Sequence, residues 1–313
     1  MLITRAITRL TLILAVATLI SAQLIGQNAA KQASERTFAT PQEAAQALLD
    51  AADKNDTAAL LKVFGPQGSD IVKSGDPAAD KDRRAEFARR AHEKMQVQME
   101  PSNPNRAVII AGNDDWPLPI PLVRTKAGQW HFDITRGRVE ILARRVGRNE
   151  LAAIDVCRGY VEAQLEYASR DRNGNGVLDY AQRIVSSPGK KNGLYSEGDP
   201  TNSLVPKAFG EAAAAIAGGK TPEPYHGYYF RILTSQGPEA PGGTQPYIVK
   251  GDMIGGFALI AYPAKYGDSG IKTFIVNHRG VVYEKDLGPS TAALAPQMTR
   301  FNPDKTWQPV QGE

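Results

Sequence analysis

The sequence predicts an α+β protein with two domains, and three patterns lead to that prediction. Helical spacing of apolar residues fills the region 40–95 and is followed by short β-type runs up to residue 134. A second helical pattern covers 140–169, and β-type runs separated by glycine-rich turns follow it. Helices followed by strands, twice over, indicate two α+β cores and not alternating βαβ units. A chain of 313 residues is long enough to form both.

The N-terminus has the pattern of a secretory signal. Two arginines precede an apolar stretch over residues 10–22, which only threonine and serine interrupt, and polar Gln23 follows. A positive start and a short apolar core are typical of a signal peptide, and the core is too short for a membrane span. We predict a signal peptide at 1–22 and a flexible lead-in at 23–37. The protein would then be exported, to the periplasm or beyond the cell, with no membrane span after cleavage; an uncleaved anchor stays the alternative.

Residues 38–137 are predicted to form a domain of helices and a small curved antiparallel sheet. Thr40, Pro41 and Glu43 make a helix start, with a threonine cap, a proline in the first turn and a glutamate three residues after the cap. The further elements expected here are helices over 58–64 and 80–95 and strands over 106–111, 118–126 and 129–134.

A long linking helix is predicted over 138–170, followed by a domain of loops and antiparallel strands at 171–313. The helical pattern contains no breaker except two glycines, and it includes Cys157 among apolar neighbours. A single cysteine allows no internal disulfide, and a buried structural thiol is the favoured interpretation of Cys157. The expected elements beyond the helix are a short helix over 208–217, strands over 227–235 and 255–263, and a hairpin over 272–285.

Charge and composition argue against a nucleic-acid partner. The formal net charge is only +4, and acidic and basic residues are well mixed along the chain. A DNA or RNA binder would concentrate lysine and arginine on one face. The sequence also lacks the phosphate-binding, dinucleotide-binding and nucleophile-elbow glycine motifs. These observations favour a non-catalytic protein.

The stretch after the long helix has the spacing of a calcium loop of the EF-hand kind. Alternate residues offer oxygen atoms, and a glycine, Gly176, stands where such a loop needs a tight turn. The predicted ligands are Asp171, Asn173, Asn175, the carbonyl of Val177, and Asp179.

The predicted affinity of this loop for calcium is weak. Gln182 replaces the bidentate glutamate that normally ends such a loop, so charge and ligand number both fall. A structural role is expected, with Leu178 anchoring the loop on the core. The alternative is an Asn-Gly turn that its own side chains stabilise without any metal.

The chain resembles an exported bacterial family, the domain of unknown function 2950 family. The resemblance rests on stretches spread over nearly the whole chain. They are Phe64–Pro66, Trp116–Leu122, Arg144–Leu151, Asp171–Gln182, Pro224–Leu233, Gly255–Pro263 and Thr273–Asn277. It implies architecture and export, and no activity.

Two looser resemblances concern the separate halves. The element order of 38–137 is similar to the nuclear-transport-factor-like (cystatin-like) fold, which implies a pocket; the candidate pocket residues are Asp114, Asp115, His131 and Asp133. The second half resembles the globular head of a type IV pilin, through Gly227–Phe230, Ala261–Pro263 and Thr273–Val281. A whole domain separates the signal from the pilin-like helix, which disfavours a filament subunit.

Two functions therefore stay open. The favoured one is an exported, non-catalytic envelope protein that binds a partner protein or belongs to an envelope assembly. The alternative is a small-ligand binding protein or enzyme that uses a pocket in the N-terminal domain. His226 precedes a strand among tyrosines and has no acidic partner or nucleophile at a motif spacing, so aromatic packing is its favoured interpretation. His278 falls in a hairpin turn and is expected at the surface.

Overall fold

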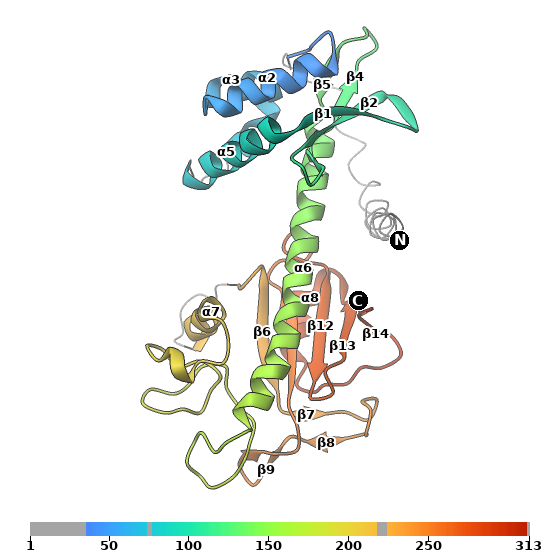
Figure 1. Cartoon of the computed structure of the whole chain (residues 1–313). Helices are drawn as coiled ribbons and strands as arrows, with labels where there is room; N and C mark the ends of the chain where they lie inside the picture. Colours follow the sequence, from blue (N-terminus) through green and yellow to red (C-terminus); the bar gives the residue numbers. More distant parts are fainter. Residues whose placement is uncertain (1–35, 74–76, 218–223, 312–313) are drawn as a thin grey trace. The chain divides into compact units, whose positions relative to one another are not determined.

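A computed structural model of the protein describes residues 36–73, 77–217 and 224–311 (Figure 1). The signal peptide predicted for 1–22 and most of the lead-in predicted for 23–37 lie outside these residues. The chain divides into two compact units, Met1–Arg144 and Arg145–Glu313, which are described in turn. Both combine helices with antiparallel sheets, so the predicted α+β class is confirmed.

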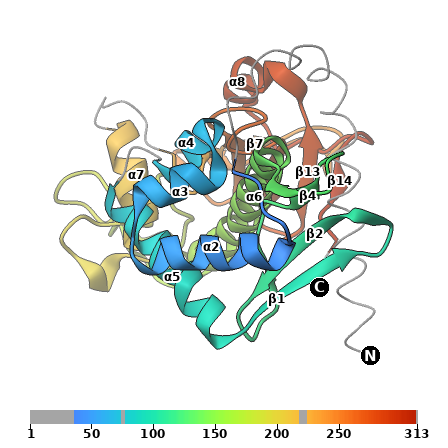
Figure 2. The same cartoon turned by 90° about the horizontal axis from the view of Figure 1, so that it is seen from above.

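The N-terminal unit begins with helices that lie side by side (Figure 2). They are α2 (Pro41–Asp53), α3 (Thr57–Phe64), α4 (Ser69–Val72) and α5 (Pro77–Glu93), with a 3-10 turn at Pro66–Gly68. The predicted start of α2 is confirmed, with Thr40 as its N-cap. The hydroxyl of Thr40 accepts from the Glu43 N–H at 3.1 Å, and the Glu43 carboxylate accepts from the Ala39 N–H at 3.1 Å.

A small antiparallel sheet packs on these helices. Its strands are β1 (Met95–Glu100), β2 (Asn103–Ala111), β3 (Trp116–Pro117), β4 (Leu122–Arg124) and β5 (Trp130–Phe132). The order is β1-β2-β4-β5, and β3 pairs with β2. Alternate residues of β2, namely Ala107, Ile109 and Ala111, are fully buried in the core between sheet and helices. Phe64 of α3 meets Phe132 of β5 edge-on, with ring centroids 5.1 Å apart.

Strand β1 was not predicted. Its sequence, Met-Gln-Val-Gln-Met-Glu, consists mostly of good helix formers, so local propensity favours continuing α5. The helix ends at Glu93, and β1 then pairs with β2 in unbroken register from Met95 to Met99. Pairing with a strong neighbouring strand therefore overrides the helical preference of these residues.

The long helix α6 spans Ile134–Tyr167, 34 residues, where 138–170 was predicted. In the C-terminal unit it runs along one face of the main sheet (Figure 1). A stripe of small and aromatic residues at intervals of four and three faces the sheet: Ala153, Cys157, Tyr160, Gln164 and Tyr167, all at most 1% exposed. This spacing keeps one side of a helix in continuous contact with its partner.

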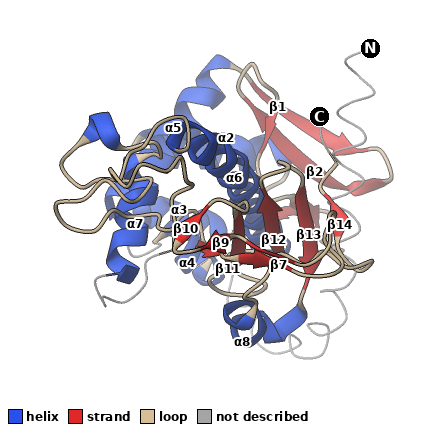
Figure 3. Cartoon of the chain, turned by 90° about the horizontal axis from the view of Figure 1, so that it is seen from below, coloured by secondary structure: helices blue, strands red, loops and turns tan. Residues whose placement is uncertain are grey.

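The main C-terminal sheet is antiparallel throughout, in the order β14-β13-β12-β11-β6 (Figure 3). Its strands are β6 (Tyr228–Leu233), β11 (Ala258–Pro263), β12 (Lys272–Asn277), β13 (Val282–Asp286) and β14 (Gln308–Pro309). The central strands are almost wholly buried, because α6 covers one face and loops with short helices cover the other. Val123 of β4 and Phe274 of β12 lie in different sheets.

Shorter elements complete the C-terminal unit. Two ribbons pair β7 (Ser235–Gln236) with β8 (Gln245–Pro246), and β9 (Ile248–Val249) with β10 (Asp252–Met253). The helices are α7 (Lys207–Ala217) and α8 (Thr291–Leu294), with 3-10 turns at Pro200–Asn202, Gly288–Ser290 and Ala295–Gln297. The two ribbons were not predicted, because two-residue strands carry no periodic signal.

Near residue 150, α6 is fastened to the loop that leads into β12. The Glu150 carboxylate accepts from the backbone N–H groups of Ile271 and Lys272 at 2.9 and 3.0 Å. Asn149 donates to the Ser269 carbonyl at 2.8 Å, and Arg145 pairs with Asp268. Burial raises the pKa of Glu150, and the two N–H groups only partly oppose that shift.

Near its other end, α6 holds the chain through a buried amide. Gln164 is fully buried, and it exchanges two hydrogen bonds of 2.8 Å with the backbone N–H and C=O of Ala181. Its amide also donates to the Tyr160 hydroxyl at 2.9 Å, and that hydroxyl donates to the Ala258 carbonyl of β11 at 3.3 Å. One side chain thus joins the helix, the segment after residue 171 and the main sheet.

Replacing Gln164 with leucine is expected to destabilise the C-terminal unit strongly. The change leaves the N–H and C=O of Ala181 buried without partners, at a cost of about 2–4 kcal/mol in the free energy of unfolding. Urea unfolding followed by circular dichroism measures this loss. The control is Glu162→Leu, an exposed position of the same helix, which should change stability by less than about 0.5 kcal/mol. Equal stability of the two variants would contradict the role of the amide.

Replacing Glu150 with glutamine is expected to become more favourable as the pH rises. A carboxyl whose pKa is raised in the folded state contributes its full stability below its ordinary pKa and loses it as the pH rises through the raised value. Glutamine is neutral at every pH and can accept the same two N–H bonds. The stability of E150Q relative to wild type should therefore increase between about pH 4 and about pH 7. A constant difference, measured by denaturant unfolding at both pH values, would contradict this account.

Candidate metal centre

The predicted calcium loop follows α6 and is held at both ends. Tyr167 ends the helix before the loop, and the bonds between Gln164 and Ala181 fix the chain after it. Between these points the backbone turns twice through the left-handed region, at Gly174 (φ +75°) and Gly176 (φ +82°). Glycine takes this conformation without the strain that a side chain would cause, so both tight turns depend on it.

Asp171 organises the first half of the loop. Its carboxylate accepts from the N–H groups of Gly174 at 2.7 Å, Asn175 at 3.3 Å and Gly176 at 2.9 Å. These backbone bonds, the one from Gly176 first, lower the pKa of Asp171, so it stays ionised at neutral pH. Asp171, the first ligand position of the predicted loop, is therefore a charged carboxylate that accepts hydrogen bonds from the surrounding backbone.

Asp179 lies at the end of the loop and is only 4% exposed. Both of its carboxylate oxygens accept from the Asn173 amide nitrogen, at 3.2 and 3.1 Å. Burial raises the pKa of Asp179, and the negative charges of Asp252 and, to a smaller extent, Asp171 raise it further. The fold thus holds carboxylates close enough to repel one another and places amide N–H groups between them.

Asp252 was not among the predicted site residues, and it comes from β10, far along the chain. The Asn175 amide donates to its carboxylate at 2.8 Å. The two segments are held together because the Tyr180 N–H donates to the Met253 carbonyl at 2.9 Å and the Gln182 amide donates to the Gly251 carbonyl at 2.7 Å. No spacing rule within the loop could have found Asp252, because its approach depends on the packing of β9 and β10.

Gln182 occupies the position of the usual bidentate glutamate, and its amide donates to the Gly251 carbonyl. The carboxylate that lies beside the loop is that of Asp252, which accepts from the Asn175 amide. The arginine inside the loop does not compete for the acids. Arg172 lies over the Tyr167 ring, 5.7 Å from its centroid, and donates to the Tyr167 carbonyl at 3.3 Å.

The donor set of the loop suits a hard cation. Its oxygens come from carboxylates, carboxamides and a backbone carbonyl, which are calcium ligands, and no histidine or cysteine is among them. Within the described ranges, no group of three or more His, Cys, Asp or Glu side chains is arranged to hold a metal. The amide nitrogens of Asn173 and Asn175 instead donate to Asp179 and Asp252. Turning both amides over would offer their oxygens in place of their N–H groups, at the loss of the bonds that these oxygens accept from the Asn175 and Val177 N–H groups.

The expected anchoring role of Leu178 is wrong. This side chain is 61% exposed, whereas its neighbour Asp179 is buried. The reason is that Asp179 takes the buried position at this point of the loop, where both of its carboxylate oxygens accept from the Asn173 amide. Ala181, which is 1% exposed, anchors this end of the loop.

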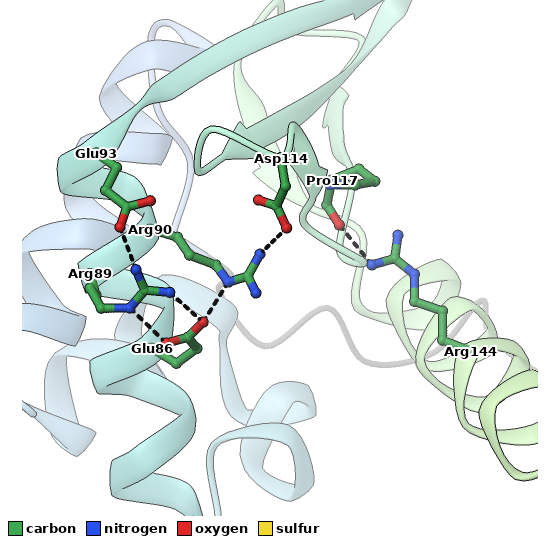
Figure 4. A network of polar contacts seen from close by, with 7 residues as sticks. All are labelled: Glu86, Arg89, Arg90, Glu93, Asp114, Pro117 and Arg144. Atoms are coloured by element: carbon green, nitrogen blue, oxygen red, sulfur yellow. Dashed lines mark hydrogen bonds and ion pairs between the residues drawn. The ribbon is translucent and has the colours of Figure 1, made fainter. Parts of the chain in front are cut away.

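Asp114 and Asp115, two of the candidate pocket residues, form ion pairs on the surface of the N-terminal unit. Asp114 pairs with Arg90 at 2.7 Å, and Asp115 pairs with Lys94 at 2.6 Å. Figure 4 shows Arg90 between Asp114 and Glu86, and Arg144 donating to the Pro117 carbonyl at 2.7 Å. Hydrogen bonds from Arg89 and Arg90 lower the pKa of Glu86 to about 2, so this network carries its full charges at neutral pH.

The other two candidates lie elsewhere in the unit. His131 is on β5, directly opposite Val123 of β4. Asp133 accepts from the Arg136 N–H at 3.0 Å and so caps the start of α6, and burial raises its pKa. An open groove of about 600 Å³ in this unit is lined by Lys94, Gln96, Val97, Gln98, Ile110 and Asp115. Of the four candidates it contains Asp115 alone.

The remaining reactive side chains of the C-terminal unit pack into the core or against aromatic rings. Cys157 is fully buried, and burial raises the pKa of its thiol to about 12, which suppresses the nucleophilic thiolate. The His278 ring lies against Tyr247 and Phe257, and burial lowers its pKa. His278 is therefore a partly buried residue and not the surface residue that was expected. The His226 ring meets the Tyr225 ring edge-on, with ring centroids 4.2 Å apart.

Comparisons with known proteins bear on the chain as a whole. None of the helices in the described parts is both long enough and apolar enough to cross a bilayer. Neither the curated proteins nor the solved structures include a match, so the likeness to pilin heads and to the nuclear-transport-factor-like fold stays a prediction. One family model matches residues 35–310, and its description is "protein of unknown function". Because the match covers most of the sequence, the chain belongs to the DUF2950 family.

Proposed function

We propose that this protein is an exported, non-catalytic envelope protein whose C-terminal unit binds a structural calcium ion and presents a surface to a partner. The observation that carries the calcium proposal is the gathering of oxygen-bearing side chains around the loop. They are Asp171, Asn173, Asn175 and Asp179 from the loop itself and Asp252 from β10.

The residues that would hold calcium are these side chains and the carbonyl of Val177. The negative charges of Asp252 and Asp171 raise the pKa of Asp179, and the N–H groups of the Asn173 and Asn175 amides offset this repulsion only in part. A bound divalent cation would offset the repulsion directly. Neutral Gln182 lowers the affinity, which suggests a dissociation constant of roughly 10⁻⁴–10⁻³ M. Such a site fills in the millimolar calcium of an extracytoplasmic space, which agrees with the predicted signal peptide.

Exposed apolar side chains beside the loop support the binding of a partner. Leu178 is 61% exposed, Val249 37% and Ile254 48%. The hydrogen bond between Tyr180 and Met253 joins the two segments that carry Leu178 and Ile254. A cation shared by the loop and Asp252 would lock these segments together, so calcium would order the surface without taking part in any reaction.

Calcium is expected to raise the melting temperature of the mature protein. At about 5 mM calcium, mass action with the affinity above stabilises the folded state by about 1–2 kcal/mol, or a few degrees. Asp171→Ala should abolish this rise, and Asp252→Asn, which keeps the bond from Asn175 but removes a charge, should reduce it. Differential scanning fluorimetry with calcium and with chelator measures the effect.

The matched control is Asp199→Ala. Asp199 also accepts from a backbone N–H two residues on, that of Thr201 at 3.1 Å, but it lies outside the calcium loop. This variant should lose some stability and keep the full response to calcium. A wild-type protein that melts at the same temperature with calcium and with chelator would overturn the calcium proposal.

Export is tested separately from calcium binding. The mature protein isolated from its native cells should begin between about Ala22 and Lys31, because the cleavage site follows the apolar core of the signal. Intact-mass measurement and N-terminal peptide sequencing determine this end. A cytoplasmic protein that retains Met1 would overturn the export proposal.

A further inference from the structure

Strand β1 forms an open edge of the N-terminal sheet. The strand order is β1-β2-β4-β5, and no described strand lies beyond β1 (Figure 2). The opposite edge is closed, because Phe38 exchanges two backbone hydrogen bonds of 2.8 Å with Trp130 of β5. An open edge offers backbone N–H and C=O groups to another strand, so proteins usually protect it with charges, proline or a covering segment.

The residues of β1 provide little of this protection. Met95–Met99 contains neither proline nor a charged residue, and its register with β2 is unbroken over these five residues. The open groove described above lies along this strand, lined by Gln96, Val97 and Gln98 among others. The edges of the C-terminal sheet differ: β14 has two residues, one of them Pro309, and β6 carries Arg231 within the strand.

The sequence of β1 is complementary to itself. Met95-Gln96-Val97-Gln98-Met99 is the same in both directions, and it is flanked by oppositely charged Lys94 and Glu100. Antiparallel pairing of two copies about an axis at Val97 places methionine opposite methionine and glutamine opposite glutamine. Lys94 of each copy then lies opposite Glu100 of the other, and the twofold symmetry makes this ion pair twice.

We propose that a second copy of this chain pairs with β1 in this antiparallel register and extends the N-terminal sheet across a twofold axis. The charges at the ends select the register, since a shift by two residues removes both ion pairs and sets methionine opposite valine. Within one chain Lys94 already contacts Asp115 at 2.6 Å, and Glu100 contacts Arg106 at 2.8 Å. The second copy therefore joins existing ion pairs into a network around each end of the paired strands.

The dimer is independent of the calcium proposal, and its interface is small. One pair of strands buries less surface than most stable complexes, so association should appear only at high protein concentration. Sedimentation velocity of the mature wild-type protein over a concentration series should show a reversible monomer–dimer equilibrium that chelator leaves unchanged. A wild-type protein that stays monomeric throughout would overturn the proposal.

Two charge-reversal variants test the register. Lys94→Glu and Glu100→Lys each place like charges opposite one another twice, so each variant alone should dimerise about tenfold more weakly than wild type. Mixed in equal amounts they should associate, because every Glu of one variant then faces a Lys of the other. Lys62→Glu, an exposed position on α3 with the same change in net charge as Lys94→Glu, is the control and should dimerise like wild type.

Cross-linking gives a second, independent measurement. Val97→Cys places two thiols opposite one another at the axis, so mild oxidation should produce a disulfide-linked dimer. Cys157 is fully buried and does not compete. Circular dichroism confirms that each variant is folded. Dimers that ignore both charge reversals and do not cross-link through residue 97 would place the interface elsewhere, and binding only to a different protein would show that the partner is not a second copy.

Discussion

The C-terminal unit depends on the buried amide of Gln164. A fully buried polar side chain is stable only when its hydrogen bonds are complete, and here the Ala181 N–H and C=O and the Tyr160 hydroxyl complete them. The geometry leaves little freedom, since any shift of the helix against the segment at 181 would leave polar groups unpaired. This constraint positions the chain after the loop and brings it to β10, next to Asp252.

The candidate calcium site follows from that placement. Asp171 and Asp179 have opposite pKa shifts although they lie in one loop, because backbone N–H groups surround Asp171 while burial and neighbouring charge act on Asp179. Two asparagine amides lie between the acids and donate to them. The carboxylates of the loop therefore repel one another, and only the N–H groups of amides and of the backbone offset this repulsion. A bound cation would reduce the repulsion further.

The two units carry different kinds of function in our account. The N-terminal unit has an exposed ion-pair network around Arg90 and an edge strand of self-complementary sequence. The C-terminal unit has the oxygen-rich loop and the apolar side chains beside it. In our proposals both features serve association with a partner or with a second copy.

The sequence alone determined the α+β class, the Thr40 cap of α2, the long helix and the oxygen spacing from Asp171 to Asp179, because all of these are local patterns of period, cap or turn. It could not determine β1, whose residues prefer a helix until β2 pairs with them. Nor could it find Asp252 or the outward direction of Leu178. Those depend on which distant segments pack together, and only the tertiary structure decides which charges meet across such a distance.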